Sequence, residues 1–153
     1  MTWTVAGIDI GRFGIMCILR EGNPEFHPLP YGKKDGELDC SVFVRSLDGV
    51  DIVYVEKPIG KNTSGMSVRY QDFGELRGLI RLHSRYIGIA PVTWKRHYGL
   101  SSDKQASIDL AKKLYPGVNL LKTQRSRVED DNMAEALLLA HYGQSFEPSN
   151  ILL

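Results

Sequence analysis

The sequence predicts an α/β fold with a mixed β-sheet flanked by helices. Two observations lead to this prediction. After residue 50, apolar runs of strand length alternate with longer helical patterns, which is typical of βα units. Before that point, residues 2–10 and 15–19 are two apolar runs joined by a short turn that contains Gly11 and Gly14, which indicates an antiparallel pair. A sheet with both parallel and antiparallel pairing is therefore expected.

The elements of the first half follow from local signals. Residues 26–29 are expected to form a third strand, which prolines interrupt. Asp39 or Ser41 is expected to cap a short helix that Gly49 ends. Residues 50–56 give the clearest strand in the chain, because they are nearly all apolar β-formers and end in a carboxylate.

The second half begins with a polar loop at residues 58–65 and a helix expected from about residue 66 to about residue 86. Residues 87–92 are expected to form a strand with Trp94 as a packing anchor at its end. Ser102 is expected to cap the next helix. Asp130 or Asp131 then opens a last helix over residues 133–142, which Gly143 closes.

The composition excludes several classes of protein. A chain of 153 residues with 42% apolar and 24% charged residues is typical of one globular domain. No apolar run approaches the roughly 20 residues of a membrane span, and the first residues lack a secretion-signal pattern, so a cytoplasmic protein without membrane contact is expected. Cys17 and Cys40 form no CxxC pattern. We therefore expect neither a zinc site nor a disulfide, and expect both thiols to be buried.

The charges are unevenly distributed, although the formal net charge is only +1. Residues 57–127 contain 14 lysines and arginines but four acidic residues. The remaining residues contain five basic and 14 acidic residues. A basic middle between acidic ends predicts a polyanion held by the middle and a cation held by the ends.

Two acidic residues stand at the ends of predicted strands. Asp9 lies near the end of residues 2–10, and Glu56 ends residues 50–56. Asp is disfavoured inside a strand, and a buried carboxylate needs a compensating charge. In open α/β sheets, sites form beyond the carboxyl ends of adjacent strands, so the two side chains converge if these strands are neighbours. A bound cation is the compensating charge that we expect.

The last predicted helix adds more carboxylates. Asp131 and Glu135 are four residues apart, an offset of about 40° around a helix, whereas Asp130 and Glu135 are offset by about 140°. Only the first pair can point at one metal, so we expect Asp131 to be the ligand and Asp130 to cap the helix. If the helix begins after Asp131, this angular argument fails and Asp130 could reach the metal from a loop. Four carboxylates that offer only oxygen ligands suit Mg²⁺ or Mn²⁺.

Three stretches resemble, in the right order, the acidic motifs of RuvC-type Holliday junction resolvases, which belong to the RNase H-like superfamily. They are Gly-Ile-Asp-Ile-Gly at 7–11, Val-Tyr-Val-Glu-Lys-Pro at 53–58 and Ala-Glu-Ala-Leu-Leu-Leu-Ala at 134–140. The intervening sequence resembles the phage-encoded branch of this family at residues 91–95, 97–100, 103–104 and 114–116. The similarity covers nearly the whole chain.

This resemblance implies one RNase H-like nuclease domain over residues 1–153, with a catalytic and metal-binding quartet of Asp9, Glu56, Asp131 and Glu135. It also implies two Mg²⁺ or Mn²⁺ ions per active site. The implied substrate is branched DNA in the form of a four-way junction, and the implied assembly is a homodimer that nicks opposed strands symmetrically. The family usually has Asp at the position of Glu135 and often His or Asp at the preceding acid, so the longer Glu135 must reach the metal differently.

The basic middle of the chain is expected to hold the DNA backbone, and an aromatic residue within it to stack on bases. The residues expected to bind nucleic acid are Lys57, Lys61, Arg69, Tyr70, Lys95, Arg96, Lys104, Lys122, Arg125 and Arg127.

Two other functions remain open from the sequence. One is an RNase H-like module that binds structured nucleic acid without cutting it, and the other is an RNA-processing nuclease of the same superfamily. Loss of a carboxylate would favour the first, but all four positions are acidic. The motif at residues 7–11 also resembles actin-like sugar kinases and ATPases, which need two such domains and are therefore disfavoured at this length.

Overall fold

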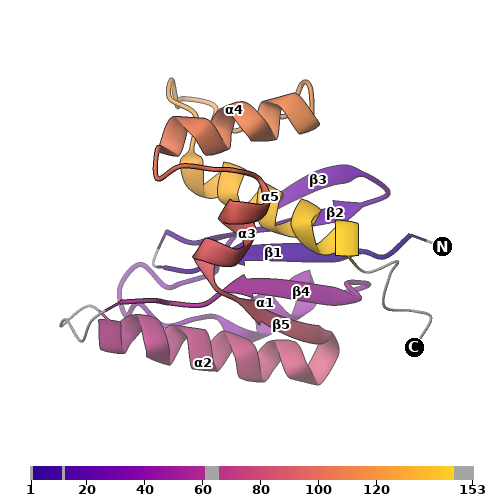
Figure 1. The fold of residues 1–153 in the computed structure, drawn as a ribbon. Coiled ribbons are helices and arrows are strands. Elements are labelled where there is room, and N and C mark those ends of the chain that lie inside the picture. The colour runs from indigo at the N-terminus through magenta and orange to yellow at the C-terminus, as the bar shows by residue number, and fades with distance from the viewer. Residues whose placement is uncertain (1, 12, 61–65, 147–153) are drawn as a thin grey trace.

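Five strands form one mixed sheet in the order β3-β2-β1-β4-β5 (Figure 1). The computed structural model describes residues 2–11, 13–60 and 66–146. The antiparallel part contains β1, β2 and β3, and the parallel part joins β1 to β4 and β4 to β5. The strands are β1 (Val5–Asp9), β2 (Ile15–Arg20), β3 (Asn23–Pro28), β4 (Ile52–Glu56) and β5 (Arg85–Ile89).

Helices cover both faces of the sheet (Figure 1). Helices α4 and α5 pack on one face with Trp94 of α3, and helices α1 and α2 lie on the other. The helices are α1 (Cys40–Ser46), α2 (Met66–His83), α3 (Pro91–His97), α4 (Lys104–Leu114) and α5 (Asp131–Phe146). No helix among the described residues is long and apolar enough to cross a membrane.

Side chains of the central strands alternate between two hydrophobic cores. On β1, Val5 faces the core beneath α5, whereas Ala6 and Ile8 face the core beneath α1 and α2. This alternation is the period of two that a strand imposes. Because both faces are covered, β1 and β4 read as continuous apolar runs, which is why the sequence indicates them clearly.

Helix α5 lies unusually close to β1. A Cβ atom on Gly7 would fall against the carbonyl oxygen of Ala136 and 2.6 Å from the amide nitrogen of Ala140. A Cβ atom on Gly143 would fall against the ring of Tyr54 and 3.0 Å from Val5. Glycine therefore sets the separation between α5 and the sheet at two points along the helix.

Several expected boundaries were wrong. The strand expected at residues 87–92 is Arg85–Ile89, and helix α3 begins at Pro91, so Trp94 lies in a helix and not at a strand end. The helix expected to reach residue 86 ends at His83. The third strand begins at Asn23 and contains two prolines, which is tolerated because β3 is an edge strand.

Three further expectations concerned single residues. Asp103, not Ser102, caps α4 by accepting a hydrogen bond from the amide of Gln105 at 3.0 Å. Gly143 does not close α5, which continues to Phe146. Cys17 is buried as expected, but Cys40 is exposed at the start of α1, and both thiols are free.

Because α5 packs so closely on β1, Gly7→Ala should strongly destabilise the protein. The added methyl group would meet helix backbone, which cannot move aside as a side chain can, so the free energy of unfolding should fall by about 3 kcal/mol. Gly78→Ala is the control, because a Cβ there meets open space on α2 and should stabilise the protein by about 0.5–1 kcal/mol. Chemical denaturation measures both changes. An unchanged stability in Gly7→Ala would contradict the packing described above.

Candidate active site

Parallel pairing of β1 and β4 brings Asp9 and Glu56 together. Ile8 lies opposite Val55 in the register, so the next residue of each strand is one of the two carboxylates. Both therefore stand at the carboxyl ends of adjacent strands, where sites form in sheets of this type. The convergence expected from the sequence is confirmed.

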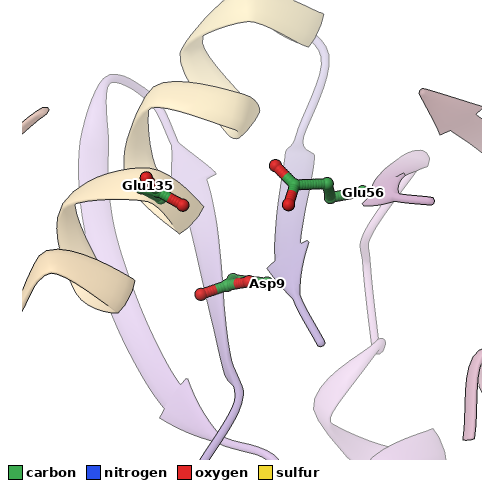
Figure 2. Close-up of side chains that lie close together, drawn as sticks. All are labelled: Asp9, Glu56 and Glu135. Carbon is green, nitrogen blue, oxygen red and sulfur yellow. The ribbon is translucent and has the colours of Figure 1, made fainter. Parts of the chain in front are cut away.

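The third carboxylate comes from helix α5. One carboxylate oxygen each from Asp9, Glu56 and Glu135 lies within 4.8 Å of the others, and Figure 2 shows the three side chains close together. Glu135 immediately precedes Ala136, whose carbonyl oxygen lies against Gly7. The close approach of α5 to β1 thus places Glu135 beside Asp9.

The three carboxylates repel one another in a partly buried cleft. Burial, followed by the charges of Glu56 and Glu135, raises the pKa of Asp9 to about 8. Burial also raises the pKa of Glu56, against the lowering effect of a hydrogen bond from Trp94. Burial and mutual repulsion therefore both favour the neutral form of a carboxyl group in this acidic cluster.

Lys95 offsets part of the negative charge of the three carboxylates. Its Nζ lies 2.9 Å from Oε1 of Glu135 and donates a hydrogen bond to it. Burial lowers the pKa of Lys95, but the hydrogen bond to Glu135 and the charges of the three carboxylates outweigh burial, and the net effect raises it. Lys95 was expected to contact phosphate, and the structure places it among the carboxylates.

Trp94 orients Glu56. Its indole Nε1 donates a hydrogen bond of 2.8 Å to Oε2 of Glu56, and its side chain is fully buried. Sequence reasoning assigned Trp94 a packing role and missed this contact. The missed signals are Pro91, which is favourable in the first turn of a helix, and Gly99 (φ 63°), which follows the helix end in the left-handed region.

The structure separates the roles of Asp130 and Asp131. Asp130 Oδ1 accepts a hydrogen bond of 3.1 Å from the amide of Met133, which is an N-cap interaction at the start of α5. Asp131 is the first helical residue and lines the same cleft as the three carboxylates. Its Oδ2 lies 3.4 Å from Nζ of Lys104. Asp131 is not one of the three residues whose oxygens lie within 4.8 Å.

These residues fit a hard divalent cation. All the candidate ligands are carboxylate oxygens, which Mg²⁺ and Mn²⁺ prefer. The oxygens of three carboxylates already lie close together, and a cation would relieve the repulsion that raises the pKa of Asp9. Asp9, Glu56 and Glu135 are therefore the residues of the described chain best suited to hold a metal.

Basic side chains surround the acidic cluster. They line a cleft of about 420 Å³ that also contains Asp9, Glu56, Asp131 and Glu135. The expected nucleic-acid-binding residues in this lining are Lys57, Arg69, Lys95 and Lys104. The cleft can therefore hold the phosphates of a nucleic-acid backbone next to a metal cation.

The other expected nucleic-acid-binding residues lie away from the centre of the cleft. Tyr70 is half exposed on α2, and Arg96 lines a separate shallow depression beyond α3. Lys122 lines a small hollow beside the cleft, and Arg125 and Arg127 are exposed between α4 and α5. Lys61 lies outside the described residues.

The fold is RNase H-like. The mixed sheet with helices on both faces matches that fold, as the sequence predicted. No protein-family model matches the sequence, and no curated protein matches it significantly. The similarity is visible in the structure.

Three solved structures share this fold over most of their length. RuvC of Thermus thermophilus in complex with a Holliday junction substrate is 11% identical, with a TM-score of 0.67 over 97% of each chain. A second structure of Thermus thermophilus RuvC is 14% identical, with a TM-score of 0.67 over 95% of this chain and 96% of that one. The Fowlpox virus resolvase in complex with Holliday junction DNA is 16% identical, with a TM-score of 0.59 over 93% and 97%.

The raised pKa of Asp9 predicts how metal-free stability depends on pH. Because the pKa rises on folding from 3.8 to about 8, folding takes up a proton between these values, and stability falls as the pH rises through them. Asp9→Asn removes the charge at nearly constant size. At pH 9 the variant should be about 2 kcal/mol more stable, or roughly 4–8 °C in melting temperature, with the difference shrinking toward pH 4. Thermal melts in EDTA test this, and a pH-independent difference would contradict it.

The Trp94–Glu56 hydrogen bond predicts weaker metal binding in Trp94→Phe. Phenylalanine keeps most of the buried bulk but cannot donate to Glu56, and loss of such a supporting contact typically costs 10- to 100-fold in metal affinity. Calorimetric titration with Mn²⁺ measures the change. Trp3→Phe is the matched control, because Trp3 packs against the same core and, within the described residues, its indole makes no hydrogen bond to a carboxylate. Equal Mn²⁺ affinity in Trp94→Phe and wild type would remove Trp94 from the site.

Proposed function

We propose that this chain is a structure-specific endodeoxyribonuclease that resolves four-way DNA junctions. The observation that supports it most is the convergence of Asp9, Glu56 and Glu135 from β1, β4 and α5 beside a basic cleft lining. Two of the proteins that share the fold are described in complex with Holliday junction DNA. In this proposal residues 1–153 act as one nuclease domain, in the cytoplasm where its DNA substrate would be met.

The proposed reaction is metal-dependent hydrolysis of a phosphodiester. Asp9, Glu56 and Glu135 would hold Mg²⁺ or Mn²⁺, and Asp131 would join them to complete a site for two ions. When bound, such ions activate water and neutralise the charge that develops on the phosphate and the leaving oxygen. Trp94 keeps Glu56 in position through a hydrogen bond that its fully buried side chain donates.

The basic residues of the cleft position the DNA. Lys57, Arg69 and Lys104 line the cleft near the carboxylates, where they neutralise phosphate and fix the strand relative to the site. Lys95 offsets the charge of Glu135 in the metal-free protein. Because the Lys95 ammonium lies within the acidic cluster, we propose that it contacts the phosphate nearest the phosphodiester bond that is cleaved.

A junction has two equivalent strands to cut, so symmetric resolution requires two active sites. We propose that a homodimer supplies them, one site in each protomer, and that the two sites nick opposed strands. The interface that joins the protomers is left open by this proposal.

Cleavage of a labelled four-way junction tests the proposal. Wild-type protein should cut the junction with Mg²⁺ or Mn²⁺ and not with EDTA, and should leave a fully paired duplex of the same sequence intact. Asp9→Asn and Glu56→Gln should lose cutting by at least about 1,000-fold, since each removes a proposed ligand. Both should still bind the junction, because removing negative charge does not weaken attraction to phosphate. Wild-type binding without cutting would favour a binding module, and cutting of RNA alone an RNA-processing nuclease.

The different contacts of Asp130 and Asp131 predict different effects of substitution. Asp131→Asn should reduce cleavage by orders of magnitude, because it removes a proposed ligand from the cleft. Asp130→Asn should keep most activity, because Asn caps a helix about as well as Asp. Cleavage rates on one junction, with melting temperatures as a folding control, compare the two variants. An inactive Asp130→Asn beside an active Asp131→Asn would reverse the assignment.

A further inference from the structure

Phe13 is an exposed aromatic side chain at the edge of the candidate active site. It lies in the turn between β1 and β2, four residues after Asp9, and 70% of it is exposed. Single exposed apolar residues are common on protein surfaces and carry no meaning by themselves. The position of this one is what distinguishes it.

The ring stands between two hollows. Phe13 and Gly14 line the cleft that contains the acidic cluster, called the catalytic cleft below. The same two residues line a smaller hollow of about 110 Å³. The smaller hollow also contains Lys122 and Asp130, whereas the catalytic cleft contains Asp131. Phe13 therefore borders both the cleft that holds the acidic cluster and the smaller hollow beside it.

The ammonium of Lys122, which lines the smaller hollow, lies over the ring of Phe13. Nζ of Lys122 lies 5.0 Å from the ring centroid of Phe13, within the range of a cation–π contact. Lys122 is not part of the catalytic cleft lining. The cleft lining thus includes Phe13 but not the cation that lies over its ring.

The turn that carries Phe13 is braced. The amide of Gly14 donates to the carbonyl of Gly11 at 2.8 Å, and the amide of Leu29 donates to the carbonyl of Gly14 at 3.0 Å. A Cβ atom on Gly14 would come within 2.6 Å of the carbonyl oxygen of Asp9. The backbone that carries the ring is thus held against β1. This lowers the entropic cost of ordering the Phe13 side chain when DNA binds.

We infer that Phe13 is a stacking platform for an unpaired DNA base of the strand held in the cleft, with Lys122 contacting the adjoining phosphate. This inference rests on the proposed function. A base inside a duplex is already stacked on both sides, so a ring at this position recognises a base that is splayed out at the branch point. Basic residues along the cleft bring the backbone to the ring, and the carboxylates lie next to the phosphate that follows.

Binding assays in EDTA on a four-way junction test the stacking. Phe13→Ala should weaken junction affinity by roughly 5- to 100-fold, the range for loss of one base–aromatic contact. Phe13→Leu should be as defective, because it is apolar but has no ring, whereas Phe13→Trp should restore binding. Val128→Ala is the matched control: Val128 is 81% exposed, lines neither hollow and should show wild-type affinity. Because Phe13 is exposed, all variants should keep the wild-type melting temperature.

Photocrosslinking locates the base. 5-Iodouracil placed at each position of the branch point should crosslink to the peptide that holds Phe13, and the crosslink should disappear in Phe13→Ala and in a fully paired duplex. If Phe13→Leu binds the junction with wild-type affinity, the contact does not need an aromatic ring and the inference is wrong. A crosslink to another aromatic residue that persists in Phe13→Ala would also overturn it. If wild-type protein shows no preference for a junction over a duplex, the proposed function itself fails, a result distinct from either of these.

Discussion

The contact between Gly7 and helix α5 is the constraint on which the candidate site depends. At this point the helix backbone lies where a Cβ atom would be in any other residue. Gly7 is two residues before Asp9 on β1, and the helix residue that it meets, Ala136, follows Glu135. Packing within the core and the geometry of the carboxylates are therefore set by one contact. A small change in the height of α5 above the sheet moves one carboxylate relative to the other two.

The site stores electrostatic repulsion that the rest of the fold offsets. Three carboxylates share one partly buried cleft with Lys95, and the pKa of Asp9 is raised first by burial and then by the charges of Glu56 and Glu135, which Lys95 offsets only in part. The hydrogen bond from the buried Trp94 stabilises the charged form of Glu56 and restricts its orientation. Part of the stability supplied by the apolar cores is used to hold these like charges together, as is usual for sites that bind metal.

Local patterns predicted the strands and the acidic residues at their ends, because buried strands and isolated carboxylates such as Asp9 and Glu56 both leave a signal within a few residues. The order of strands in the sheet follows from packing between distant segments, and the neighbouring positions of β1 and β4 became certain only in the structure. Helix α3 was missed because its seven residues include one buried side chain, Trp94, and so show no helical periodicity. The Trp94–Glu56 hydrogen bond joins positions 38 residues apart, and no local pattern reports such a contact.

The prolines of β3 have a consequence for how copies of the chain can associate. Pro24 and Pro28 lie four residues apart on an edge strand, where amide groups alternate between its two sides, so both positions fall on the same side. Proline has no N–H, and in sheets it is tolerated where that group would face solvent. A further strand laid along β3 would therefore lack two donors in its ladder. Pairing of a second chain along this edge is therefore disfavoured, which protects the protein from edge-to-edge aggregation and would direct the proposed dimer to other surfaces.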